Sequence, residues 1–196
     1  MTQNDCDYMQ LALETARRAP VMGEVPIGAV LVLDSQVLSR AHNCRESWQD
    51  PTAHAEVIAL REAAARLGTW RLTGTTLYVT IEPCSMCAGA MIQARVSRLV
   101  FGARDPKAGA CGSVFNLPDE RRLNHRVQVI GGLLEQECQE LMRAFFRERR
   151  NGNGVEAAAA DRHGTPNFPL PLEAGGSRGG GRCSFRPPGA TRRRPS

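Results

Sequence analysis

Two short patterns constrain the fold of this chain more than any other feature. They are His54-Ala55-Glu56 and Pro83-Cys84-Ser85-Met86-Cys87, and they supply one imidazole and two thiols. Cys84 follows His54 by thirty positions. Zinc takes nitrogen and thiolate ligands, and catalytic sites use three protein ligands so that the fourth position stays open for water. We therefore expect His54, Cys84 and Cys87 to bind one zinc ion, which requires a fold that brings the two segments together.

A carboxylate follows two positions after the expected histidine ligand. Zinc lowers the pKa of a bound water from about 15.7 to about 7, and Glu56 is the candidate for moving protons at that water. Side chains at i and i+2 do not share a helix face, so His54 can bind metal while Glu56 reaches toward the water. The alternative is that Glu56 only interacts favourably with the helix dipole as a first-turn acid.

The same residues admit a purely structural interpretation. HxE or CxxC alone is a weak signal, whereas both together, with a proline directly before the CxxC, are much rarer by chance. A closed structural zinc site would need a fourth protein ligand, for which the candidates are His42, Cys44, Cys111 and Cys138. A reduced CxxC beside a core histidine is the remaining structural alternative.

Charge and composition divide the chain into two parts. The net charge of +5 is uneven, because residues 1–150 carry 18 basic and 17 acidic groups and residues 151–196 carry 7 and 3. The second part also has 9 glycines and 6 prolines in 46 residues, a composition typical of disordered low-complexity segments. We expect one catalytic domain over 1–150 and a disordered tail rich in Gly, Pro and Arg over 151–196.

The sequence favours a cytoplasmic protein that does not span a membrane. Its longest apolar run, Ile27–Leu33, is far shorter than a membrane-spanning helix. Asp5, Asp7 and Glu14 stand where a signal or transit peptide would be basic. Seven cysteines without a secretion signal indicate reduced thiols rather than a disulfide framework.

The apolar periodicity predicts an α/β layered domain in which helices alternate with strands. We expect helices over residues 8–18, 53–67, 84–94 and 133–150, and strands over 26–33, 36–41, 75–81, 98–102 and 127–130. Asp34-Ser35 is expected to turn the first strand into the second as a hairpin. Both metal-binding segments begin predicted helices, which would place the zinc between two helix N-termini at one edge of the sheet.

Three segments resemble the bacterial tRNA-specific adenosine deaminases. They are Asp50–Glu56 (DPTAHAE), Glu82–Met91 (EPCSMCAGAM) and Phe101–Lys107 (FGARDPK), and the resemblance covers about residues 4–150. It implies a cytidine deaminase-like fold, a three-layer α/β/α sandwich with a five-stranded mixed sheet. It also implies a homodimer with one zinc per subunit. The implied reaction converts adenosine to inosine at the wobble position of a tRNA anticodon, with a zinc-activated hydroxide and Glu56 as proton shuttle.

The resemblance further implies that Asn43, Asp105, Phe145 and Arg149 contact the RNA substrate. Each of these residues has a simpler explanation. Asn43 suits a turn, and Asp105 precedes a proline at a strand end. Phe145 lies on an apolar helical stripe, and Arg149 complements the negative end of a helix.

Two other functions remain open from the sequence. The zinc pattern is shared by deaminases of free bases or nucleosides of the guanine or cytosine type. A non-catalytic, zinc-stabilised RNA-binding module would require four protein ligands on the metal and no role for Glu56.

Overall fold

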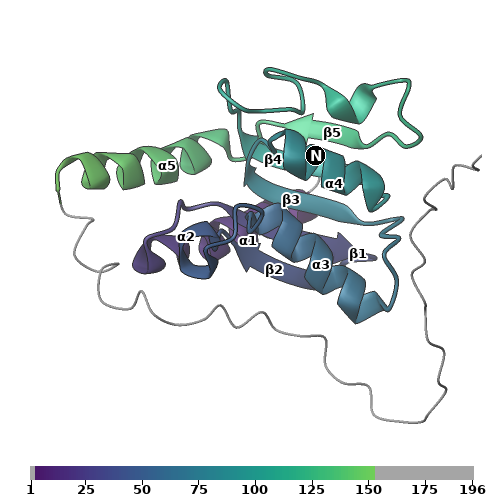
Figure 1. Cartoon of the computed structure of the whole chain (residues 1–196), viewed down its shortest axis with the longest axis horizontal. Coiled ribbons are helices and arrows are strands. Elements are labelled where there is room, and N and C mark those ends of the chain that lie inside the picture. Colours follow the sequence, from purple (N-terminus) through teal and green to yellow (C-terminus); the bar gives the residue numbers. More distant parts are fainter. Residues whose placement is uncertain (1–2, 153–196) are drawn as a thin grey trace, which may run out of the picture.

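The computed structural model describes residues 3–152, which form a five-stranded mixed sheet of order β2-β1-β3-β4-β5 (Figure 1). β1 pairs antiparallel with both β2 and β3, whereas β3, β4 and β5 run parallel. The strands are β1 (Gly28–Leu33), β2 (Gln36–His42), β3 (Thr76–Ile81), β4 (Arg98–Ala103) and β5 (Gln128–Gly131). All five predicted strands are therefore present.

The hairpin between β1 and β2 has the turn that the sequence predicts. Asp34 and Ser35 connect the strands with φ angles of 47° and 64°. Two central residues with positive φ are typical of a type I′ turn, whose twist matches that of the flanking strands. The sheet pairing then continues from Leu33 opposite Gln36 to Gly28 opposite His42, with one irregularity at Leu31/Val32.

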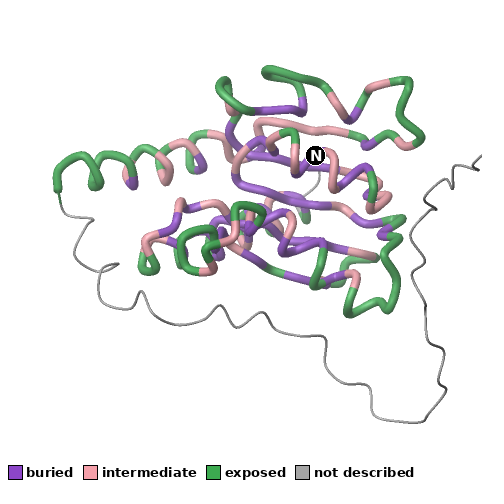
Figure 2. Tube along the Cα trace, viewed as in Figure 1, coloured by how far each residue is buried: buried purple, intermediate pink, exposed green. Residues whose placement is uncertain are grey.

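Helices cover both faces of the sheet, which confirms the three-layer α/β/α architecture. The long helices are α1 (Gln3–Ala16) and α5 (Glu135–Arg150) on one face, and α3 (Ala55–Leu67) and α4 (Ser85–Gln93) on the other. Short elements complete the fold: α2 (Arg45–Trp48), η1 (Ala19–Met22) and η2 (Leu117–Asp119). The outer end of α5 extends beyond the sheet and is exposed (Figures 1 and 2).

The alternation of side chains along β1 explains the two cores. Ala29 and Leu31 point into the core beneath α3 and α4, while Val30 and Val32 point into the core beneath α1. All four are buried, as the uninterrupted apolar sequence of this central strand requires (Figure 2).

A glycine lets α1 lie close to the sheet. A Cβ atom at Gly28 would stand 2.1 Å from the carbonyl oxygen of Ala12, which is far inside van der Waals contact. Any larger residue at this position would push α1 away from β1.

A buried ionic cluster ties α1 to the start of β4. The Asp5 carboxylate, 2 % exposed, accepts two hydrogen bonds from the Arg98 guanidinium at 2.8 and 3.0 Å and one from the Tyr78 hydroxyl at 2.8 Å. Burial, followed by the contact with Asp5, raises the pKa of Tyr78. The cluster lies at the end of the parallel strands opposite to that from which α4 departs.

The helices differ from the expected ranges mainly at their ends. α1 begins at Gln3 instead of residue 8, and the four-residue α2 was not predicted. No helix among residues 3–152 is long and apolar enough to cross a membrane. The expected disordered tail lies outside the described residues, apart from Asn151 and Gly152.

Candidate metal centre

The three expected metal ligands lie at the N-termini of α3 and α4. His54 caps α3 with φ −78° and ψ 147°, and Cys84 caps α4 with φ −71° and ψ 175°. Cys87 follows in the first turn of α4 and is completely buried. The two helix N-termini thus bring these side chains together, with ligand atoms within 4.8 Å of one another.

The ligand atoms have the spacing of a tetrahedral metal site. The distances are 3.7 Å between the two Sγ atoms, 3.8 Å from Cys84 Sγ to His54 Nδ1 and 3.5 Å from Cys87 Sγ to His54 Nδ1. Zinc in tetrahedral geometry, with Zn–S of about 2.3 Å and Zn–N of about 2.0–2.1 Å, sets S–S separations of about 3.8 Å and S–N separations of about 3.6 Å. The group therefore fits a zinc ion without rearrangement.

The electrostatics of this group favour a cation. Contact with Cys87, with His54 adding to it, lowers the pKa of Cys84 to about 3 despite burial. Contact with Cys84, followed by burial, raises the pKa of Cys87, and contact with Cys84 also raises the pKa of His54. Protons are thus shared within the group, and a bound metal would displace them.

Glu56 lies beside the ligands without belonging to their group. Its side chain is 2 % exposed, and Oε2 has no hydrogen-bond partner among the described residues. Burial is the main cause that raises the pKa of this carboxyl. Buried polar atoms almost always have a partner, so an unpartnered carboxylate oxygen beside a metal-binding group fits a site that holds a ligand.

No fourth His, Cys, Asp or Glu ligand joins the group within residues 3–152. His42 Nδ1 instead lies 2.8 Å from the Asn43 carbonyl and 3.7 Å from Cys44 Sγ. Cys111 Sγ faces a main-chain carbonyl, and Cys138 is buried on the opposite face of the sheet. The four candidates for a closed structural site therefore lie elsewhere, and the three-ligand arrangement leaves a position for water or substrate.

Asn43 is buried beside the first turn of α3, next to His54. Its side chain is 3 % exposed, and Oδ1 accepts a hydrogen bond from the Ala55 amide at 3.0 Å. The side chain thereby satisfies one of the free amides at the start of α3. Asn43 thus orients the helix that carries His54 and Glu56.

Asp105 forms the turn that its sequence context predicts. Its Oδ1 accepts hydrogen bonds from the amides of Lys107 at 2.9 Å and Ala108 at 3.2 Å. The half-buried side chain closes the loop after β4, and its own amide donates to Glu82.

Phe145 and Arg149 lie together on α5, with the guanidinium 5.3 Å from the ring centre. Phe145 is only 8 % exposed and belongs to the buried stripe, whereas Phe146 is 42 % exposed. Of the two adjacent aromatic residues near the end of α5, Phe146 is therefore the one that a ligand could reach. Phe146 borders a groove of about 400 Å³ that is lined by Lys107, Met142, Arg143, Phe146 and Arg150.

The sequence interpretation missed Glu82. This carboxylate is 2 % exposed and accepts hydrogen bonds from the Ser113 hydroxyl and from the amides of Asp105, Cys111 and Ser113. Burial tends to raise its pKa, but these hydrogen bonds outweigh burial and hold the pKa below its ordinary value. An acidic residue placed directly after a buried strand was the available signal, because a buried charge needs partners.

Sequence comparison places the chain among deaminases. The profile of the MafB19-like deaminases matches residues 3–150. A tRNA-specific adenosine deaminase of Bacillus subtilis is 53 % identical over 150 residues, which cover 76 % of this chain and 92 % of that protein. The Haemophilus influenzae protein of the same name is 47 % identical over 155 residues, covering 79 % and 90 %.

Structural comparison agrees. A solved tRNA:A34 deaminase, studied for A-to-I editing at the wobble position of transfer RNA, superposes with a TM-score of 0.67 at 47 % identity, covering 69 % of this chain and 98 % of that one. A guanine deaminase from Nitrosomonas europaea has a TM-score of 0.59 at 27 % identity, covering 70 % and 81 %. With its three-ligand site and its cytidine deaminase-like sheet, the chain therefore belongs to the deaminases, in the family of the bacterial tRNA-specific adenosine deaminases.

Proposed function

We propose that this enzyme converts adenosine to inosine at the wobble position of a tRNA anticodon, using one zinc ion per subunit. The observation that carries the proposal is the arrangement of three ligand atoms within 4.8 Å of one another beside a buried, unpartnered Glu56 oxygen. The substrate is supported by relatives of 46–53 % identity that are named for it.

Glu56 moves the protons of this reaction. When bound, zinc supplies a water of lowered pKa at its open position. Glu56 Oε2 takes up one proton of this water while the water oxygen adds to C6 of the adenine ring, and it passes that proton to N1. Glu56 then moves the proton of the new C6 hydroxyl to the amino nitrogen, so that the C6–N bond breaks, ammonia leaves and the C6 carbonyl of inosine remains. Burial raises the pKa of this carboxyl, which makes it a stronger base than an exposed glutamate and so suits it to proton transfer.

The substrate must be an unpaired nucleotide in a loop. A base inside an intact helix hides C6 from a metal site within the protein, whereas a loop base can turn into the site. The groove between Lys107 and α5 supports an RNA substrate, since it combines the apolar Met142 and Phe146 with three cationic side chains. Such a surface can hold unpaired bases and phosphates.

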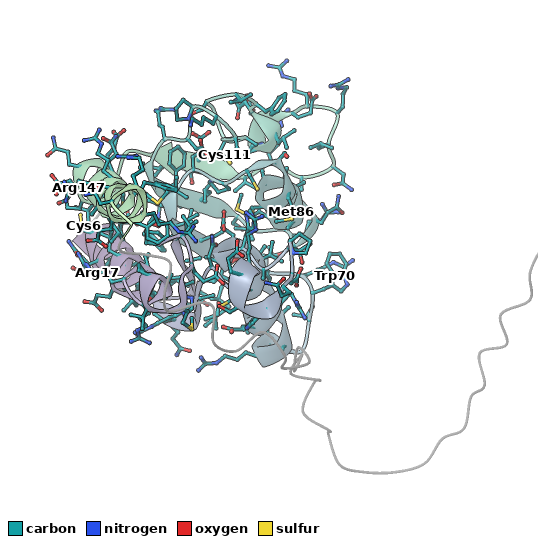
Figure 3. The ribbon with its side chains drawn as sticks, turned by 60° about the vertical axis from the view of Figure 1, so that its left-hand side comes forward. Cys6, Arg17, Trp70, Met86, Cys111 and Arg147 are labelled. Carbon is teal, nitrogen blue, oxygen red and sulfur yellow. The ribbon has the colours of Figure 1, made fainter. Side chains whose placement is uncertain are left out.

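We infer that the enzyme acts as a homodimer through the face formed by α3 and α4. An apolar groove of about 340 Å³ lies there, lined by Val57, Leu60, Arg61, Ala64, Trp70, Leu72, Ala90, Gln93 and Ala94. Trp70 is 54 % exposed and projects from the edge of the molecule (Figure 3). Large exposed aromatic side chains are typical of interfaces. Sedimentation or light scattering of the wild type and Trp70→Glu tests this inference.

We assign the activity to residues 1–150 and place the enzyme in the cytoplasm with its tRNA substrate. The family profile ends at residue 150, which is also the last residue of α5. A chain truncated after Arg150 should therefore keep its activity on tRNA. A large loss of activity would show that residues 151–196 take part in substrate binding.

The proposal is tested by incubating the zinc-loaded enzyme with tRNA and, separately, with adenine, guanine, cytosine and cytidine. Inosine formed in tRNA, at the wobble position only, is the expected result. Turnover of free bases alone would assign the enzyme to the guanine or cytosine deaminase type. A third function, RNA binding without catalysis, predicts that Glu56→Ala changes nothing, whereas we expect this variant to keep its zinc and to lose inosine formation.

A further inference from the structure

Glu82 connects the metal-bearing helix α4 to the loop that follows β4. It lies between the end of β3 and Pro83, two residues before the Cys84 ligand. Its Oε1 accepts the amides of Cys111 at 3.0 Å and Ser113 at 2.9 Å, and its Oε2 accepts the Asp105 amide at 3.2 Å and the Ser113 hydroxyl. One buried carboxylate thus binds both ends of the segment 105–113.

The middle of this segment is bound to the metal-bearing turn by its main chain. The Ala110 amide donates to the Pro83 carbonyl at 2.8 Å, and Gly109 forms a β-bridge with Cys84. A Cβ atom at Gly109 would stand 2.5 Å from Glu82 Cδ, so the loop closes tightly around the carboxylate. The segment 105–113 is therefore attached to the turn before α4 at its middle as well as at both ends.

The same segment reaches the groove on α5. Lys107, two residues after Asp105, lines that groove together with Phe146 and Arg150. The conformation of Lys107 depends on the Asp105 turn, because Asp105 Oδ1 holds the Lys107 amide. Glu82 in turn holds the Asp105 amide. A continuous set of hydrogen bonds thus runs from Glu82 to the edge of the groove.

We propose that Glu82 is a positioning residue for the substrate: it fixes the segment 105–113 so that Lys107 and the metal centre engage one RNA molecule in a single register. This rests on the proposed function for the identity of the substrate. Glu82 touches neither the substrate nor the reacting atoms, and it acts through the loop that it orders.

Glu82→Gln is the test, because the amide keeps the shape of the carboxylate but cannot accept all four hydrogen bonds. With its oxygen toward Cys111 and Ser113, the new NH₂ group faces the Asp105 amide, so two donors oppose each other. We expect amide hydrogen exchange across 105–113 to accelerate about tenfold or more. The KM for tRNA should rise by about tenfold, with kcat within about twofold of wild type and the zinc content unchanged.

Asp5→Asn is the matched control. Asp5 is also 2 % exposed and accepts hydrogen bonds from Arg98 and Tyr78, but it lies at the opposite end of the parallel strands. This variant should lower the Tm and leave both the KM and the exchange of 105–113 unchanged. If Glu82→Gln does not fold, Gly109→Ala replaces it, since the added Cβ displaces the loop from Glu82 and should produce the same rise in KM.

Three outcomes would overturn the proposal. The first is unchanged exchange across 105–113 in Glu82→Gln, and the second is a loss of zinc, which would mean that Glu82 supports the ligands instead of the loop. The third is a fall in kcat with an unchanged KM. If the wild type itself does not act on tRNA, the proposed function fails, and the exchange measurement still decides whether Glu82 orders the loop.

Discussion

Asn43 Oδ1 accepts the amide hydrogen of Ala55 at 3.0 Å, so a buried side chain from the end of β2 fixes the first turn of α3. His54 and Glu56 flank that amide on either side. The orientation of His54, a proposed metal ligand, and of Glu56, the proposed proton carrier, therefore depends on a hydrogen bond that α3 makes with a residue outside the helix.

Replacing Asn43 with alanine should cost about 1 kcal/mol of stability, which is typical for the loss of a helix-capping side chain. It should also lower activity, because the α3 turn is no longer held. Asn43→Asp keeps the accepting oxygen and should recover most of the Tm.

If Asn43→Asp folds as wild type but binds tRNA weakly, the Asn43 NH₂ group also contacts the nucleotide. Thermal unfolding and the KM for tRNA, measured on both variants, distinguish the two roles; an unchanged Tm in Asn43→Ala contradicts the capping role.

Glu56→Gln should reduce inosine formation by about 100-fold or more, the scale of a lost general acid–base group. Zinc content should stay the same, because Glu56 is not among the ligands. Loss of zinc in this variant would contradict the assignment.

The zinc-free form of Glu56→Gln should be more stable than zinc-free wild type at neutral pH. Burial raises the pKa of Glu56 above its ordinary value of 4.5, so folding favours the protonated carboxyl. Wild type accordingly loses stability, relative to the variant, as the pH rises from 4.5 through the raised pKa. The difference in Tm should vanish below pH 4.5, and a difference that grows on acidification would refute the raised pKa.

Thiol labelling should distinguish the metal ligands from the other buried cysteines. Burial raises the pKa of Cys44 to about 11 and those of Cys111 and Cys138 to about 12, so these thiols should react slowly at neutral pH. Cys84 should be protected while zinc is bound and should react soon after a chelator removes the metal. Peptide mass spectrometry after alkylation measures both effects. If Cys84 is labelled at the same rate with and without the chelator, the assignment of Cys84 as a metal ligand is wrong.

Arg98→Gln should destabilise the fold by about 3 kcal/mol, because it removes the guanidinium that forms an ion pair and two hydrogen bonds with the buried Asp5 carboxylate. Activity per folded molecule should persist, since this cluster lies away from the metal centre. Arg122→Gln is the control: Arg122 and Glu120 form an exposed ion pair whose removal should leave the Tm unchanged. If the two substitutions lower the free energy of unfolding in urea equally, the buried ion pair contributes no more to stability than the exposed one, contrary to this prediction.

The strands and long helices were predictable because the spacing of apolar residues along the sequence indicates each of them. β1 is apolar at every position and is buried on both faces. Of the predicted stripe on α5, Cys138 and Phe145 are buried, and Leu141 and Met142 are half-buried. α2 has no such signal. Its four residues are held by Glu24, whose Oε1 accepts the Ser47 amide at 2.7 Å and the Ser47 hydroxyl at 2.8 Å. Glu24 and Ser47 are 23 positions apart, so no repeating pattern in the sequence indicates their contact.

The candidate metal-binding group was predictable from the spacing of its residues, but its surroundings were not. His54, Cys84 and Cys87 follow from residue types that zinc requires, and the structure brings them together. The partners of Glu82 are mostly main-chain amides, which every residue except proline possesses, so the sequence cannot mark them. The exposure of Phe146 depends on how α5 is rotated against β4, a property of tertiary packing.

His54 and Cys84 belong to helices that follow different strands, yet their side chains meet. An ion held by both would close a ring of 31 residues, from 54 to 84, that contains all of α3 and β3. Closing such a ring removes conformations from the unfolded chain, as a covalent cross-link would. The proposed zinc ion would then also hold α3 and α4 together in one layer of the sandwich, and the zinc-free enzyme should open first between these two helices.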